Sequence, residues 1–182
     1  QSKTGALIVL QRADGLADII GTGVQLNAEV TSAFLEQVFY KDTPLHDGAL
    51  IIAKGRCAAA RCRLPNSSQL DMQTSAHPLG LRHRAGLGLA EVRDAVTVIV
   101  SEERGQISYC ERGTLERSIS PERLRELLTD AFTETWKWRG GQLRTPLSDR
   151  VRSALTLHPG TKFAGLALAA AVTYTPSVHA QT

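Results

Sequence analysis

Apolar residues along this chain follow two patterns, short continuous runs and stripes with helical spacing. The continuous runs are rich in Val, Ile, Leu and Ala, as in strands that are buried on both faces. Five segments are predicted strands: 5–11, 49–53, 57–64, 95–100 and 106–111. Lys54-Gly55 and Arg104-Gly105 separate neighbouring strands, and such pairs are typical of the tight turns in hairpins.

Residues 27–39 place their apolar side chains on one face of a helix. Val30, Phe34 and Val38 share the stripe, and Asn27 is in position to be the N-cap. This spacing predicts a helix that packs on the first strand.

The clearest helical pattern covers residues 120–138. Ser120 is the expected N-cap, Pro121 occupies the first helical position, and apolar residues recur at i, i+3, i+4, i+7 and i+8. Gly140-Gly141 is expected to end this helix, and another helix is expected to begin near residues 82–84. Because strands and helices alternate, the predicted class is α/β, with a mixed central β-sheet flanked by helices.

Length and charge narrow the function classes. The 182 residues suffice for one domain with a core, which we place at 1–140, followed by a basic linker and an apolar tail at 141–182. The formal net charge of +3 is too mild to indicate a nucleic-acid partner, and we expect none. Any anion site must therefore be local.

Cys57, Cys62 and Cys110 form no Cys-x-x-Cys pair and have no His cluster beside them, so we expect buried thiols in a reducing cytosol. No signal-like segment opens the chain, and its abrupt start on a strand suggests a piece of a longer protein. The apolar stretch 163–172 is shorter than the ~20 residues of a membrane-spanning helix. It is open to three interpretations, the start of a membrane segment, a docking tail or a disordered end, and we favour the last two.

His46, Asp47 and Gly48 stand directly before a predicted buried strand. An Asp-Gly pair in this position is most often only a turn. The alternative is a carboxylate at the mouth of a strand that holds Mg²⁺ or Mn²⁺ or accepts a proton from a substrate hydroxyl. His46 either shares that metal or ends the turn.

Arg82, His83 and Arg84 gather positive charge where a helix is expected to begin. Three consecutive residues do not share one helix face, but at a loop-to-helix junction they can surround one anion. Arginine forks match phosphate oxygens, and the N–H groups of a helix start favour negative charge. Gly86 and Gly88 would let the backbone approach closely. A polyphosphate site and an ordinary basic turn are about equally compatible with this stretch.

Ser101, Glu102 and Glu103 follow the strand at 95–100. Acidic residues at a strand end are usually solvated. In α/β sheets, however, ligands bind beyond the carboxyl ends of strands, where a hydroxyl and two carboxylates suit a metal or a ribose.

Taken in order, the segments KTGALIVLQR, TPLHDGALII, RCRLP, GLRHRAGLGLAEVRDAVTVIVSEERG and WKWRG closely resemble the diadenylate cyclase domain, which makes cyclic di-AMP from two ATP molecules. The resemblance covers about residues 3–140, and the Asp-Gly-Ala and Arg-His-Arg triplets in this order are a specific signature. It points to the membrane-type branch of the family and implies the fold of that domain, without its preceding helix.

The resemblance also implies roles for individual residues. Asp47 would be the catalytic carboxylate near the ATP 3′-hydroxyl. A divalent cation, Mg²⁺ or Mn²⁺, would be held by Asp47 with His46 and Glu103. Gly48 and Ala49 would let the nucleotide lie against the backbone. The other implied nucleotide-binding residues are Arg82, His83 and Arg84 on the triphosphate, Leu64 on the adenine, and Leu81, Ala85, Ser101, Glu102 and Glu103 around them.

Two departures from the family pattern stand out. Leu81 occupies a position where the family commonly has a small hydroxyl residue, and the loop at 65–80 is longer than usual. Because each ATP must attack the other, the resemblance implies a face-to-face homodimer. It also implies a cytoplasmic domain, tethered to the membrane in the full-length protein beside a membrane-anchored regulatory partner. The alternative function is a non-catalytic nucleotide sensor.

Overall fold

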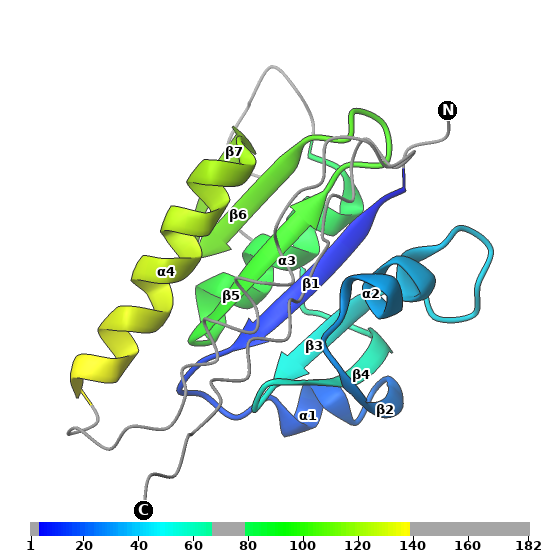
Figure 1. Ribbon diagram of the computed structural model, residues 1–182, viewed down its shortest axis with the longest axis horizontal. Helices are drawn as coiled ribbons and strands as arrows, with labels where there is room; N and C mark the ends of the chain where they lie inside the picture. The colour runs from blue at the N-terminus through cyan, green and yellow to red at the C-terminus, as the bar shows by residue number, and fades with distance from the viewer. Residues whose placement is uncertain (1–3, 67–78, 139–182) are drawn as a thin grey trace, which may run out of the picture.

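The computed structural model describes residues 4–66 and 79–138 (Figure 1). Within these ranges the chain forms seven strands and four helices. In chain order they are β1 (Ala6–Gln11), α1 (Ala17–Ile20), β2 (Val24–Glu29), α2 (Ser32–Phe39), β3 (Ala49–Ala53), β4 (Arg56–Cys62), α3 (Leu81–Val92), β5 (Ala95–Val100), β6 (Ile107–Glu111), β7 (Thr114–Ile119) and α4 (Pro121–Trp138).

All seven strands belong to one sheet, in the order β2-β4-β3-β1-β5-β6-β7. The central strand β1 runs parallel to β3, with Ile8 opposite Leu50, and antiparallel to β5, with Ile8 opposite Val98. The other neighbouring pairs are antiparallel. Lys54 and Gly55 both have positive φ, as a two-residue hairpin turn requires. The predicted mixed sheet with hairpins is therefore confirmed.

Helices cover both faces of the sheet, with α4 in front of it and α3 behind it in Figure 1. Alternate residues of a strand point to opposite faces. Ala6, Ile8 and Leu10 of β1 pack with residues of α2 and α4, whereas Leu7 and Val9 pack with residues of α1 and α3. Burial on both sides explains why the apolar run of β1 is uninterrupted.

The predicted helix start at Asn27 is wrong. Asn27 lies in β2 with φ of 51°, and its Oδ1 accepts a hydrogen bond from Arg56 Nε at 2.6 Å. The helix begins after Thr31, whose hydroxyl oxygen accepts a hydrogen bond from the Phe34 N–H at 3.2 Å. Both residue types cap helices well. The pairing of β2 with β4 decides which of the two caps the helix, and the pattern of apolar residues in the sequence does not indicate that pairing.

Sequence periodicity also does not indicate β2, β7 or α1. β2 and β7 are the edge strands of the described sheet, and all of their residues are exposed or half-buried. Such strands lack the apolar run that marks a buried strand. α1 is a single turn in which only Ile19 is buried.

α4 begins as predicted. The Arg123 N–H donates to Ser120 Oγ at 3.2 Å, so Ser120 caps the first turn, and Pro121 is the first helical residue. Gly140-Gly141, expected to end the helix, lies outside the described residues.

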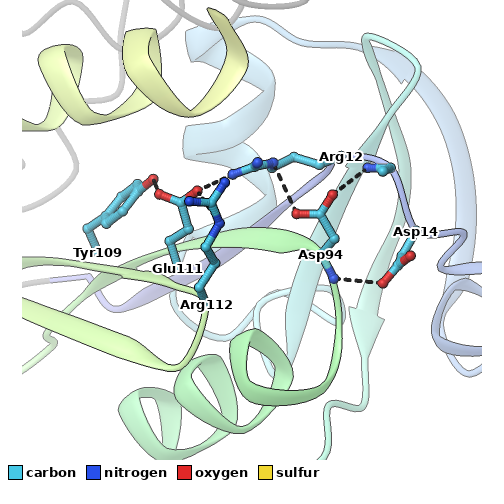
Figure 2. Close-up of polar contacts among 7 residues, drawn as sticks. Arg12, Asp14, Asp94, Tyr109, Glu111 and Arg112 are labelled. Atoms are coloured by element: carbon cyan, nitrogen blue, oxygen red, sulfur yellow. Dashed lines mark hydrogen bonds and ion pairs between the residues drawn. The ribbon is translucent and has the colours of Figure 1, made fainter. Parts of the chain in front are cut away.

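An ionic network joins three strands at the end of the sheet where β1 finishes (Figure 2). Arg12, directly after β1, forms ion pairs with Asp94, directly before β5, and with Glu111, the last residue of β6. Tyr109 donates its hydroxyl to Glu111 Oε2 at 2.7 Å. Because only 5% of the Arg12 side chain is exposed, losing one of its carboxylate partners would weaken the compensation of a buried charge. The network therefore fixes this end of the three strands.

The three cysteines are buried free thiols, as expected: Cys57, Cys62 and Cys110. Burial raises the pKa of each thiol to about 11. At neutral pH they are protonated and serve as small core residues.

The close approach of Gly23 to β4 yields a stability prediction. A Cβ at this position would lie 2.5 Å from the carbonyl oxygen of Ala60 and would also collide with Cys62 Sγ. We expect Gly23→Ala to lower the free energy of unfolding by about 1–3 kcal/mol, as overpacking does. Gly15→Ala is the matched control, because nothing lies within 4 Å of its Cβ position. Urea titration of both variants is the measurement, and equal midpoints would contradict the packing seen here.

Candidate active site

A cavity of about 1310 Å³ lies at the end of the sheet where β1 begins and β5 ends. Its walls come from the α1–β2 connection, the residues before β3, the end of β4, the first turn of α3, the β5–β6 connection, and single residues of β6 and β7. A site for a drug-sized ligand typically has about 300–1,000 Å³. The cavity is therefore large enough for a nucleotide.

Sheet topology explains why segments far apart in the sequence meet here. Because β1 and β3 are parallel, Gly5 and Gly48, each directly before its strand, lie at the same end of the sheet. Because β5 is antiparallel to β1, Ser101 after β5 lies at this end as well. The carboxyl end of β5 thus meets the amino ends of two parallel strands.

Ten of the residues that sequence analysis assigned to the site line this cavity. They are Asp47, Gly48, Leu64, Leu81, Arg82, His83, Ala85, Ser101, Glu102 and Glu103.

Three other expected residues are not placed at the cavity wall. His46 Nδ1 lies 2.6 Å from the carbonyl oxygen of Thr43, inside the turn before β3. Ala49 is fully buried in β3, opposite Cys62 of β4. Arg84 lies two residues beyond Arg82, and two residues of helix rotate a side chain by about 200° to another face. These three residues are not among those that line the cavity, and their contact with a ligand stays a prediction.

The first turn of α3 forms one wall of the cavity. Gly80 is its N-cap and supplies no side-chain hydrogen bond to the turn. Its carbonyl oxygen accepts from the N–H groups of His83 and Arg84, at 3.0 and 3.2 Å. The earlier N–H groups of a helix have no partner within the helix, so they are available to an anion.

Gly86 serves packing and does not approach a ligand, which corrects the sequence interpretation. A Cβ on Gly86 would lie 2.9 Å from Ile99 Cδ1 and 3.0 Å from Thr97 Oγ1. The Thr97 hydroxyl also donates to the Gly86 carbonyl oxygen at 3.2 Å. The missing side chain lets α3 lie directly on β5, and this contact sets the position of the whole first turn.

Arg82 forms an ion pair inside the cavity wall. Its Nη1 donates to Glu102 Oε2 at 2.7 Å. A Cβ on Gly5 would lie only 2.8 Å from Arg82 Nη1 and 3.0 Å from Glu102 Cβ. The backbone of Gly5 therefore forms a floor beneath the pair.

His83 is buried and packs against the sheet. Its Nε2 lies 3.1 Å from Ser108 Oγ on β6. Burial, and secondly the charge of Arg117, lower the pKa of His83, while the charge of Glu103 acts in the opposite direction. At neutral pH the uncharged imidazole therefore ties α3 to β6.

Gly48 holds Asp47 at the mouth of the cavity. Its φ of 124° is a conformation that favours glycine, and a Cβ there would lie 2.9 Å from the carbonyl carbon of Arg61. Arg61 itself has φ of 57°, and the register between β3 and β4 shifts after Ala49. The irregular start of this strand pair leaves the exposed Asp47 directed at the cavity rather than into the sheet.

Sequence reasoning missed most of the basic residues at the cavity. Five arginines and three carboxylates line it, and four of the arginines were not predicted: Arg61, Arg63, Arg104 and Arg117. The alternating Arg-Cys-Arg at the end of β4 was a usable signal for two of them. Arg117 could not be predicted, because its strand, β7, shows no apolar pattern.

The donor set of the cavity fits a divalent cation that phosphate helps to hold. Mg²⁺ usually binds one or two carboxylates together with phosphate oxygens and waters. Asp47 and Glu103 both line the cavity. Among the described residues, no group of three or more His, Cys, Asp and Glu side chains could hold a metal alone. The predicted three-residue site that includes His46 is therefore not assembled in one chain.

Within residues 4–66 and 79–138, no helix is long and apolar enough to cross a membrane. The apolar stretch 163–172 and most of the predicted loop, residues 67–78, lie outside the described residues.

The profile of the DAC family, described as DisA bacterial checkpoint controller nucleotide-binding, matches residues 1–115. The chain is 42% identical over 146 residues to cyclic di-AMP synthase CdaA of Bacillus subtilis (strain 168), which covers 76% of this chain and 52% of the relative. It is 43% identical over 148 residues to a diadenylate cyclase of Listeria monocytogenes serotype 1/2a (strain 10403S), with coverage of 77% and 53%. The chain therefore spans about half the length of these relatives.

Solved structures show the same α/β architecture. DacA from Staphylococcus aureus, crystallised as a double mutant, superposes with a TM-score of 0.66 at 46% identity, covering 70% of this chain and 83% of that one. A protein from Bacillus cereus described as a hypothetical membrane spanning protein gives a TM-score of 0.58 at 41% identity, covering 64% and 56%. The predicted fold is confirmed.

The burial of His83 predicts a pH dependence of stability. The pKa of His83 in the folded state lies below the ordinary 6.5. As the pH falls through 6.5, the unfolded chain therefore binds more protons than the folded chain does. Stability contributed by the neutral ring is therefore present above this pH and decreases below it, down to the folded pKa. We expect His83→Gln to flatten this part of the profile, measured as urea midpoints between about pH 7.5 and pH 5. An unchanged slope in the variant would contradict the assignment.

Proposed function

Because this chain belongs to the DAC family, we propose that it is the catalytic part of a diadenylate cyclase, which joins two ATP molecules into cyclic di-AMP and releases two pyrophosphates. One observation carries the proposal. A single cavity brings the carboxylate of Asp47 together with Arg82 and the residues after β5, from three separate segments of the chain.

The proposed reaction is a pair of identical phosphoryl transfers. In each, the 3′-hydroxyl oxygen of one ATP attacks the α-phosphorus of the other. A new phosphorus–oxygen bond forms, the bond from the α-phosphorus to the pyrophosphate oxygen breaks, and the hydroxyl loses its proton. Proteins accelerate such transfers mainly by alignment and by stabilising charge on the phosphate oxygens.

We assign Asp47 to the attacking hydroxyl. An exposed carboxylate at the mouth of the cavity can accept a hydrogen bond from a 3′-hydroxyl and then its proton. Gly48, which follows it, also lines the cavity, and we propose that the nucleotide lies beside it.

We assign the triphosphate to the arginine-rich wall. Arg82 is the direct phosphate ligand of the Arg-His-Arg triplet, because it alone of the two arginines lines the cavity. His83 positions the turn through Ser108. The first turn of α3 adds its N–H groups, which favour negative charge. Arg61 and Arg63 at the end of β4 add further positive charge to the cavity lining.

Leu64 and Leu81 provide the apolar part of the site. Leu64 is half-buried at the cavity wall and is suited to contact a base. Leu81 is 78% exposed at the start of α3, where the family commonly has a hydroxyl residue. A leucine offers no hydrogen bond there, so backbone N–H groups have to supply the polar contact to the nucleotide.

A divalent cation, Mg²⁺ or Mn²⁺, completes the proposed site. Asp47 and Glu103 would hold it with phosphate oxygens and water. When bound, such a cation neutralises charge on the phosphates.

A homodimer is the proposed active form. Each ATP is both nucleophile and electrophile, so two nucleotide sites have to face each other. Two copies related by a two-fold axis provide this arrangement with one self-complementary contact, the commonest symmetry of soluble oligomers.

We further propose that the domain works at the cytoplasmic face of a membrane, as part of a longer, tethered protein beside a membrane-anchored regulator. The support for the membrane is the similarity to the Bacillus cereus protein described as membrane spanning.

Replacing the proposed base tests the chemistry. We expect Asp47→Asn to reduce cyclic di-AMP formation from ATP and Mn²⁺ by at least about a hundredfold, because general-base catalysis typically contributes 10²–10⁴. Asp130→Asn, an exposed carboxylate of α4, is the control with the same charge change and should retain full activity. Product is measured by chromatography and pyrophosphate release. Normal turnover by Asp47→Asn would refute its role, and a wild type that binds ATP without any turnover would favour the nucleotide sensor.

The dimer makes a separate kinetic prediction. Activity per chain should rise with protein concentration and level off when dimers predominate, because a lone chain holds half of the reacting pair. Initial rates over a dilution series, paired with sedimentation at the same concentrations, check this. A constant rate per chain throughout the monomer range would exclude the face-to-face arrangement.

A further inference from the structure

The phosphate-binding arginine of the cavity already has an acidic partner within the chain. Arg82 Nη1 donates to Glu102 Oε2 at 2.7 Å, and Arg82 is also the residue to which we assign the triphosphate. An arginine binds phosphate most strongly when two parallel N–H groups point at its oxygens. A carboxylate on Nη1 occupies one of the donors that such a contact uses.

The two side chains of this pair differ in their freedom to move. The Arg82 side chain is 23% exposed, whereas that of Glu102 is 60% exposed. A Cβ on Gly5 would lie 2.8 Å from Arg82 Nη1 and 3.1 Å from Arg82 Cζ, so the backbone of Gly5 borders the guanidinium on one side. Glu102 is therefore the partner that can swing into solvent at little cost, while Arg82 stays at the wall.

We infer that Glu102 is an internal counter-ion that competes with the phosphates of the nucleotide for Arg82. The inference rests on the proposed function, since it concerns the same phosphate site. It assigns Glu102 a different role from the one implied by the resemblance, which placed it among the nucleotide-binding residues. Binding of a polyphosphate replaces the carboxylate on Arg82, so each phosphate ligand that uses Arg82 binds more weakly than it would to an unpaired arginine.

Neutralising the counter-ion should strengthen phosphate binding. The probe is inorganic pyrophosphate, titrated calorimetrically into the full 182-residue chain with a chelator present, so that no divalent cation takes part. We expect Glu102→Gln to bind pyrophosphate about two- to fivefold more tightly than the wild type, the range for loss of a partly exposed ion pair. If Glu102 instead held Arg82 in position for the phosphate, Glu102→Gln would bind pyrophosphate more weakly than the wild type.

A matched pair elsewhere in the chain provides the control. Arg93 Nη2 lies 2.6 Å from Asp18 Oδ2, with side chains 36% and 59% exposed, and neither residue lines the cavity. Asp18→Asn removes the same charge from a similar ion pair and should leave pyrophosphate affinity unchanged.

A double-variant cycle with Arg82→Ala makes the test specific. In that background Glu102→Gln should have no effect, because the competition requires the arginine. If Glu102→Gln still raised the affinity for pyrophosphate without Arg82, the cause would be the change in net charge of the cavity, and the inference would be overturned. Unchanged or weaker binding by the single variant, with its thermal unfolding still cooperative, would also overturn it. Failure of the wild type to bind pyrophosphate in the chelator would also overturn the inference, whereas the proposed function is tested separately, by turnover of ATP with Mn²⁺.

Discussion

The two-sided burial of β1, with a parallel neighbour on one side and an antiparallel neighbour on the other, is the constraint on which the rest of this structure depends. Parallel pairing with β3 and antiparallel pairing with β5 bring the starts of two strands and the end of a third to one end of the sheet. The opposite end is fixed by Arg12 with its two carboxylate partners. One end of the sheet is thereby held by charge, and the other carries a cavity.

Close packing of α3 on β5 transfers this constraint to the cavity. Gly86 brings the helix against Thr97 and Ile99, and His83 ties its first turn to Ser108. The position of Arg82 thus follows from contacts on the buried side of the helix rather than from its charged side. The arginines and carboxylates around it are consistent with the proposed binding of a polyphosphate with a divalent cation, and Arg82 is paired with Glu102 within the chain.

Local patterns were sufficient where one element supplies its own signal. The buried strands β1, β3 and β5, the capped start of α4 and the three core thiols were all predicted from apolar runs, an N-cap and cysteine spacing. The edge strands β2 and β7 were not, because a half-exposed strand has no apolar run and is defined by its hydrogen-bonded neighbour. Asn27 and Thr31 show the same limit: both residues can cap a helix, and only the pairing of β2 with β4 assigns one to a strand and the other to the cap.

The sequence by itself determined the α/β class, the buried strands, and the two triplets that signal the family. Tertiary structure alone decided which side chains of those segments reach the cavity. Helical rotation turns Arg84 away from it while Arg82 stays, the turn before β3 draws His46 aside from Asp47, and an unpredicted edge strand contributes Arg117. The physical reason is that identity and periodicity are local properties of a chain, whereas a site is formed by register and close approach between segments that the sequence separates widely.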